Sequence, residues 1–454
     1  MDELSISQRL AAHVAGTRWE DLSKDALDAA KRMTLDTLAV AWAGADAPGI
    51  ESVRTLMIEE GGAAHGSVWT TAVRLPARVA AFLNSAASAA LDFDGMRATE
   101  RGSVHADSVV LPAALAVAER EDRSGRELLE ALVLGNDVVT RLGAASALPH
   151  KGWYLTSIYG IFGAAAAAAR LMRLDAEATA HAFGLAANHA AATQLPNIER
   201  SLAKRYSSSF AAHDGVLAAS MAACGITAAT QAFEGRSGFY DLYQNGEPAL
   251  LFDGLGRTWP HVHTGVKRYP SCACNHTAVE AALYLAREFA PDSQDIVSAD
   301  VTISPYVHRL VGAPFDPGED PQVAAQFSVQ YSVAVAMLRK RFGVADIAPG
   351  AVCDPQTVRF ARSIEVRVEN AWGNSRAATV ALTTRRHGRR EHHVEHIPGS
   401  EKAPLSERDL SDKALDCLQA GPAPLDRERA ERLIATILTL ETLPDANALL
   451  AGVR

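Results

Sequence analysis

The stretches FGAAAAAARL at residues 162–171 and ARVAAFLNSAASAAL at residues 77–91 decide the fold class. Alanine has the highest intrinsic helix propensity, and its short side chain lets neighbouring helices approach closely. Alanine on every face of such a stretch predicts a helix buried inside a bundle. Residues 1–265 are therefore predicted to be helical, with one helix capped by Ser23 and others at residues 76–92, 109–121, 126–144, 157–174, 176–193 and 209–224.

The pattern changes after about residue 265. Apolar and polar residues alternate in DVTIS, SIEVRVE, RAATVALTT and RREHHVEHI, at residues 300–304, 363–369, 376–384 and 389–397. Strict alternation predicts half-buried antiparallel strands, with helices between them at about 274–289 and at 321–341. From about residue 406 the pattern is helical again, so the α+β unit is an insertion if these last helices pack on the first ones.

Composition restricts the class of protein. The chain has 454 residues, 48% of them hydrophobic and 21% charged, with a formal net charge of -9. These values are ordinary for soluble globular proteins, and the charge gives no basic surface for nucleic acid or an anionic membrane. The longest apolar run, residues 160–169, is half the length of roughly 20 residues that a membrane span needs. Five cysteines and an acidic, polar N-terminus (MDELSISQRL) predict a cytoplasmic protein without a disulfide framework.

The sequence gives little support for a bound cofactor or metal ion. The sequence contains no glycine-rich phosphate loop of the dinucleotide or nucleotide type. The histidine-rich residues 392–396 (HHVEH) resemble a metal cluster, but alternation in a strand divides them between two faces, and a solvated polar surface explains them better. Cys272 and Cys274 are one residue apart and lack a second pair, which favours a structural role. We expect neither a metal nor a cofactor.

Four short strings carry chemistry. They are LDFD followed by HADS, KRYSSS, KRYPSCACNH and QFSVQY, at residues 91–108, 204–209, 267–276 and 326–331. Loops between helices let reacting groups converge, a lysine ahead of a helix start suits an anion, and a domain boundary favours a small-molecule pocket. Taken singly, each string has a plainer interpretation as a capped loop, a solvated helix start, a solvated boundary loop or core packing.

Together, these strings resemble the MmgE/PrpD family, which includes 2-methylcitrate dehydratase, cis-aconitate decarboxylase and iminodisuccinate epimerase. The similarity covers nearly the whole chain, from residues 35–38 (LDTL) to residues 398–405 (PGSEKAPL). The resemblance implies a mainly α subunit with an inserted α+β domain. A large all-helical domain would comprise residues 1–265 and 406–454, and a smaller α+β lid domain residues 266–405. It also implies a homodimer and no metal.

The resemblance places the active site between the two domains. It implies that Lys204 and Lys267 stabilise negative charge beside a substrate carboxylate, that His105 moves the proton, that Tyr331 donates a proton and that Asp92 orients His105. The implied catalytic residues are Asp92, His105, Lys204, Lys267 and Tyr331, and the implied substrate-binding residues are Lys204, Lys267, Tyr154, Ser207 and Arg268.

Several positions differ from the family pattern. Gly95 and Met96 replace an acidic and a small polar residue, Ala-Asp follows His105 in place of Pro-Ser, and Tyr154 and Ser207 stand where many members have His. The function predicted is a cofactor-independent lyase, a dehydratase that removes a proton next to a carboxylate of a small hydroxy di- or tricarboxylate. The alternatives are an epimerase of an amino- or imino-dicarboxylate and a non-catalytic organic-acid binder. No nucleic-acid or membrane partner is expected.

Overall fold

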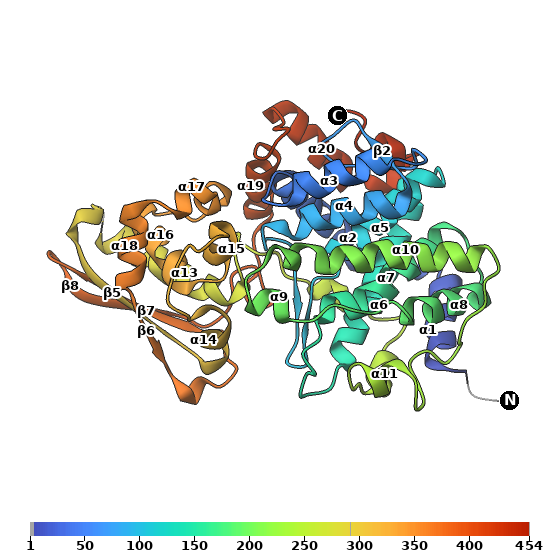
Figure 1. The fold of residues 1–454 in the computed structure, drawn as a ribbon, viewed down its shortest axis with the longest axis horizontal. Coiled ribbons are helices and arrows are strands. Elements are labelled where there is room, and N and C mark those ends of the chain that lie inside the picture. Colours follow the sequence, from blue (N-terminus) through green and yellow to red (C-terminus); the bar gives the residue numbers. More distant parts are fainter. Residues whose placement is uncertain (1–3, 291, 454) are drawn as a thin grey trace.

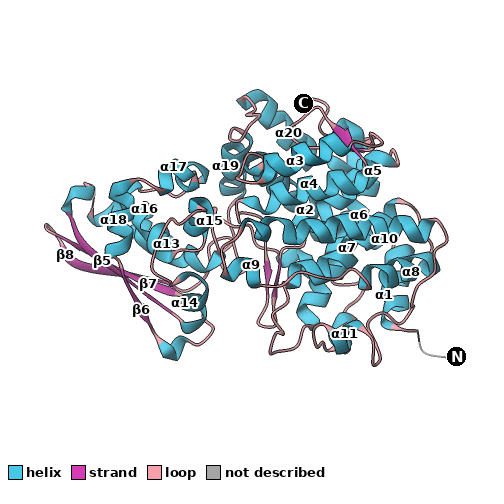
Figure 2. Cartoon of the chain, in the orientation of Figure 1, coloured by secondary structure: helices cyan, strands magenta, loops and turns pink. Residues whose placement is uncertain are grey.

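The chain folds into a larger helical lobe and a smaller lobe that contains a twisted sheet (Figure 1). The computed structural model describes residues 4–290 and 292–453. Residues 1–3, at the start of the polar N-terminal stretch, lie outside the described residues. Helices dominate both lobes (Figure 2), so the prediction of a mainly α fold is confirmed.

The larger lobe contains helices from both ends of the chain. Most helices begin and end within a few residues of the predicted positions, although the helix predicted at 176–193 ends at Ala187. Ser23 caps its helix by accepting a hydrogen bond from the backbone N–H of Ala26. The helices of this lobe are α1 (Ile6–Gly16), α2 (Lys24–Gly44), α3 (Ile50–Glu60), α4 (Ala77–Ala90), α5 (Asp107–Arg120), α6 (Gly125–Ala145), α7 (Leu155–Leu171), α8 (Ala176–Ala187), α9 (Leu195–Ile198), α10 (Ser207–Ala223), α11 (Phe239–Leu242), α12 (Pro248–Leu251), α19 (Glu407–Leu418) and α20 (Arg427–Leu438).

Helix α7 forms the centre of this lobe. Residues 164–169, all alanine, are fully buried, and α6 and α10 pack along the helix. A Cβ atom added at Gly163 would lie 2.7 Å from the carbonyl oxygen of Gly135 on α6. Glycine is therefore required where α6 and α7 cross, and the small side chains explain how so many helices pack closely.

The C-terminal helices return to the larger lobe. Helices α19 and α20 both pack against α2. The indole N–H of Trp42, on α2, donates to the carbonyl oxygen of Ala423, between α19 and α20, at 2.6 Å. The end of the chain thus reaches the same helix layer as its beginning (Figure 1).

The smaller lobe combines a four-stranded sheet with short helices. The strands run in the order β6-β5-β7-β8. The elements are α13 (His276–Phe289), β5 (Ile296–Ile303), α14 (Pro305–Val311), α15 (Pro321–Gln326), α16 (Val329–Arg339), α17 (Pro349–Val352), α18 (Pro355–Ser363), β6 (Glu365–Val368), β7 (Ala378–Thr384) and β8 (Gly388–Val394).

Three expectations about secondary structure are wrong in detail. Strands β5 and β6 pair in parallel, because the helices between them carry the chain back across the sheet; only β5–β7 and β7–β8 are antiparallel. The helix predicted at 321–341 is broken where Ser328 caps α16 by accepting from the N–H of Tyr331. Short hairpins interrupt the helical region at β1 (Gly66–Ser67) with β2 (Arg74–Leu75) and at β3 (Arg97–Ala98) with β4 (Ser103–Val104).

Among the residues that the structure describes, no helix is both long and apolar enough to cross a membrane.

Candidate active site

The candidate site is built around the loop of residues 91–95, which follows α4. Asp92 and Asp94 are both buried in this loop. Asp92 has a φ of 50°, in the left-handed region that non-glycine residues rarely adopt. Such a conformation persists only where the surroundings hold it, and several buried donors contact this loop.

Two lysines from distant parts of the sequence converge on Asp92. Lys204 lies in the short 3₁₀ helix η2 (Leu202–Tyr206), and its ammonium forms an ion pair and hydrogen bond with Oδ1 of Asp92. Lys267 Nζ donates to the backbone oxygen of Asp92 at 2.7 Å and lies 3.2 Å from Oδ2. Lys204, Lys267 and Asp92 are 7%, 4% and 4% exposed. The structure therefore brings together three of the predicted catalytic residues.

Electrostatics keep this carboxylate ionised. Burial alone would raise the pKa of Asp92, but the ammonium groups of Lys204 and Lys267 outweigh it and hold that pKa far below its ordinary range. Taking charges out of water is costly unless each has a partner. Asp92 is the carboxylate that contacts both ammonium groups, and each ammonium has three N–H donors, so donors remain for a further anion.

His105 lies beside Asp94 rather than Asp92. Its Nδ1 atom is 3.2 Å from Oδ2 of Asp94, and its backbone N–H donates to the hydroxyl of Thr156 at 3.0 Å. Burial would raise the pKa of Asp94, but the adjacent His105 lowers it to about 2. The carboxylate beside the histidine is thus Asp94. No described contact joins Asp92 to His105, so the prediction that Asp92 orients His105 has no support from the geometry. The LDFD string contains both carboxylates, but the sequence does not show which one faces the histidine.

Tyr154 lies near the same group, immediately before α7. It is half-buried, and burial, followed by the negative charge of Asp94, raises the pKa of its phenol well above the ordinary value. Tyr154 therefore stays protonated at neutral pH, although the raised pKa makes its phenol a weaker proton donor than an ordinary tyrosine. Where many family members have a histidine, this chain has Tyr154, which also carries a proton near the site.

No described hydrogen bond or ion pair joins the three other predicted site residues to Asp92 or His105. The hydroxyl of Tyr331 donates to the backbone oxygen of Asp346, and its ring packs against Phe315 in the smaller lobe. The Arg268 guanidinium is partly exposed and pairs with Glu280 at 3.2 Å and Asp409 at 3.3 Å. Ser207 is buried at the start of α10, where its backbone oxygen accepts from the hydroxyl of Ser157 at 2.7 Å.

Within residues 4–290 and 292–453, no three His, Cys, Asp or Glu side chains lie close enough together to hold a metal ion. The chemistry that these residues can perform is proton transfer by His105 and Tyr154 beside a cationic site formed by Lys204 and Lys267.

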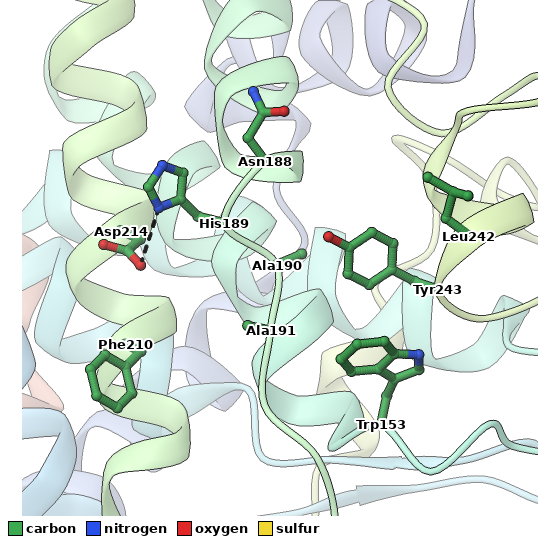
Figure 3. A pocket seen from close by; sticks show the side chains of 9 residues that line it. All are labelled: Trp153, Asn188, His189, Ala190, Ala191, Phe210, Asp214, Leu242 and Tyr243. Atoms are coloured by element: carbon green, nitrogen blue, oxygen red, sulfur yellow. Dashed lines mark ion pairs between the residues drawn. The ribbon is translucent and has the colours of Figure 1, made fainter.

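A cavity of about 690 Å³ opens near this group but is separate from it. Figure 3 shows Trp153 and Tyr243 on one side of it, opposite the ion pair of His189 with Asp214, and Phe210 on the same side as that ion pair. Among the described residues that line it, none belongs to the lysine–carboxylate group around Asp92. Trp153 precedes Tyr154 in the chain, so the cavity and the site share one backbone segment.

Family models identify the chain. The model of the MmgE/PrpD N-terminal domain matches residues 8–251, and that of the MmgE/PrpD C-terminal domain matches residues 269–441. The chain belongs to the MmgE/PrpD family. The resemblance read from the short strings is therefore confirmed.

Several relatives of this MmgE/PrpD protein have names that state an activity. The human cis-aconitate decarboxylase is 26% identical over 464 residues, covering 98% of this chain and 94% of the relative. The cis-aconitate decarboxylase-like protein oryM of Aspergillus oryzae is 25% identical, covering 99% of this chain and 97% of the relative. A cis-aconitate decarboxylase of Aspergillus terreus is 28% identical over 343 residues, covering 70% of this chain and 69% of the relative.

Proposed function

We propose that this protein is a lyase that moves a proton at a carbon next to a carboxylate of a small di- or tricarboxylate. The observation that carries the proposal is the pair of buried ammonium groups, Lys204 and Lys267, which share the single carboxylate of Asp92 beside His105 and Asp94. A buried cationic pair with only one carboxylate between them suits a substrate anion.

A substrate carboxylate would bind to the N–H donors of the two lysines that Asp92 does not use. Each ammonium has three N–H donors, and Lys267 directs one of them to the backbone oxygen of Asp92. A substrate carboxylate would take further donors from both lysines. As charge develops on the neighbouring carbon, attraction to two desolvated ammonium groups lowers the barrier by several kcal/mol.

Dehydration is the first candidate reaction, as the sequence predicts. His105, beside the carboxylate of Asp94, would accept the proton from carbon. The carbon–oxygen bond would then break with its electron pair on the hydroxyl oxygen, which leaves as water after taking a proton. Tyr154 is the acid at this position, since its phenol keeps its proton near neutral pH. This assignment replaces Tyr331, whose hydroxyl is bound to Asp346.

Decarboxylation is the second candidate, and the names of the relatives favour it. A carbon–carbon bond would break, carbon dioxide would leave, and the electron pair would stay on the substrate carbon beside a carboxylate. A proton from the protonated imidazole of His105 would then complete the product. This reaction needs one acid group rather than a base and an acid, and His105 can supply it.

We also propose a domain arrangement, an oligomeric state and a cellular location for the protein. Residues 1–265 with 406–454 would form the body, and residues 266–405 a lid that covers the site from the smaller lobe. The active form would be a cytoplasmic homodimer that requires neither metal nor cofactor.

One experiment separates the candidate functions. The purified protein is incubated in heavy water with cis-aconitate, citrate and 2-methylcitrate, and proton NMR follows each acid. A new unsaturated dicarboxylate with carbon dioxide release indicates decarboxylation, and a new double bond with loss of a hydroxyl indicates dehydration. Deuterium uptake without a new product, tested also on an amino- or imino-dicarboxylate, indicates epimerisation. Binding without any of these changes would mean that the protein only binds organic acids.

A further inference from the structure

Lys413 reaches the candidate site from the C-terminal helix α19. Lys413 is 8% exposed, and its ammonium donates to the backbone oxygen of Phe93 at 2.9 Å. It also lies 3.8 Å from the centre of the Phe93 ring. Phe93 is the residue between Asp92 and Asp94, so Lys413 contacts the backbone that links the two carboxylates of the site.

A buried ammonium requires a counter-charge, and Asp36 supplies it. Oδ1 of Asp36, on α2, lies 2.5 Å from Nζ of Lys413. Asp36 itself is fully buried. Because α2 belongs to the tightly packed helix layer, the ion pair fixes the lysine head group relative to the larger lobe. Lys413 is therefore anchored at one side and donates to Phe93 at the other.

Further donors hold the neighbouring backbone atoms. The side-chain amide of Gln326 donates to the oxygen of Ala90 at 3.1 Å, and Lys267 donates to the oxygen of Asp92 at 2.7 Å. Three carbonyl groups within four residues thus accept from three side chains that are far apart in the sequence. Such convergence accounts for the left-handed backbone at Asp92, which needs external support.

We propose that Lys413, anchored by Asp36, is a positioning residue that holds the Phe93 carbonyl and thereby sets the places of Asp92 and Asp94. The proposal rests on the lyase function proposed above. No described contact joins Lys413 to Lys204 or His105, and its hydrogen bond to the site is the one to the Phe93 carbonyl in the loop. Its loss would displace the carboxylates that face the lysines and the histidine, and small displacements of reacting groups cost large factors in rate.

The test variant removes both charges together. Lys413→Met alone would leave Asp36 buried and unpaired, which destabilises the fold for a reason unrelated to positioning. The double variant Lys413→Met/Asp36→Asn avoids that charge but still leaves the Phe93 carbonyl without its donor. We expect its kcat to fall by about 10- to 100-fold, with a KM within about threefold of wild type because Lys204 and Lys267 are retained. Lys413→Arg, which keeps a charged donor, should lose less kcat than the double variant.

A matched control uses the ion pair of Lys31 with Glu441. Lys31 also lies on α2, and its Nζ atom is 2.7 Å from Oε1 of Glu441 near the C-terminus. The variant Lys31→Met/Glu441→Gln therefore removes another contact between α2 and the chain end, without touching residues 91–95. We expect it to keep kcat within about twofold of wild type.

Hydrogen exchange gives a readout that does not depend on turnover. The amides of Asp92 and Met96 bond to the oxygens of Ala89 and Gly265 at 3.2 and 2.9 Å, on either side of Phe93. We expect peptides that cover them to exchange faster in the Lys413→Met/Asp36→Asn variant than in wild type or in the Lys31 control, with similar melting temperatures for the two double variants.

The outcomes separate this proposal from the proposed function. Wild-type kcat and wild-type exchange in the Lys413→Met/Asp36→Asn variant would overturn the positioning role, as would an equal loss in the control. If wild type turns over none of the acids, the lyase proposal fails and the exchange measurement alone decides the role of Lys413. If the double variant does not fold, Asp36→Asn decides, because it removes the anchor and leaves Lys413 in place: reduced kcat at wild-type KM with faster exchange around residues 92–96 supports positioning, and wild-type kcat with wild-type exchange overturns it.

Discussion

Replacing Lys267 by alanine tests the cationic site most sharply among single substitutions. Lys267 is 4% exposed, and its ammonium donates to the oxygen of Asp92 at 2.7 Å and lies 3.2 Å from Oδ2. A hydrogen bond to a charged group contributes about 1.5–3 kcal/mol, which corresponds to roughly 10- to 150-fold in kcat/KM. Removing one partner of a buried ion pair costs about 3–5 kcal/mol of stability. We expect the lower end of that range, because Lys204 still neutralises Asp92.

Arg268→Ala is the matched control, since the two residues are adjacent in the chain. Arg268 pairs with Glu280 and Asp409 in a partly exposed position, where ion pairs contribute about 0–1 kcal/mol. The assay is steady-state turnover of the acid identified in the substrate panel, with urea unfolding of both variants. Wild-type kcat/KM in the Lys267→Ala variant would refute the assignment of a cationic site, and an equal loss in Arg268→Ala would show that the effect is not specific to the buried ammonium.

Four further outcomes follow from the same contacts. The pKa of Asp94 is about 2 in the folded protein, against an ordinary 3.8. The ionised carboxylate therefore contributes about 2 kcal/mol to the free energy of unfolding above pH 4, and this contribution is lost as pH falls from about 4 to 2. In urea unfolding between about pH 4 and 2, the free energy of unfolding of Asp94→Asn should depend less on pH than that of wild type, and an equal dependence would contradict the pairing. Asp94→Asn should also lower kcat, because the imidazole Nδ1 of His105 would lose the carboxylate that lies 3.2 Å away; wild-type kcat in this variant would count against the pairing. Tyr331→Phe should cost about 1 kcal/mol of stability while kcat stays within about twofold, and a loss of more than tenfold at unchanged stability would restore its predicted catalytic role. Treatment with a chelator should leave turnover unchanged, and activity that falls with removal of a bound metal and returns on its addition would contradict the expected metal independence.

Much of the fold follows from local sequence. Alanine-rich stretches such as residues 162–171 gave the helices of the larger lobe because propensity and close packing act in the same direction there. The parallel pairing of β5 with β6 could not be predicted, since alternation specifies a strand but not the direction of its partner. The break between α15 and α16 depends on the Ser328 cap, which competes with an otherwise continuous helical pattern.

The site was predictable in part. Asp92, Lys204 and Lys267 were identified from short strings and the family resemblance, and the structure brings them together. The choice between Asp92 and Asp94 as the neighbour of His105 depends on a left-handed backbone that the sequence does not specify at a non-glycine residue. Lys413 was missed because its string, DKALD, reads as an ordinary amphipathic helix; only packing of α19 against α2 directs its ammonium toward Phe93.

A structure of the protein with a saturated tricarboxylate, which cannot react, would test the central claim most directly. The account predicts that one carboxylate of this ligand lies about 2.7–3.2 Å from the ammonium nitrogens of both Lys204 and Lys267, with the neighbouring carbon within reach of His105. Binding in the cavity beside Trp153 and Tyr243, with both lysines still occupied by Asp92 alone, would contradict it.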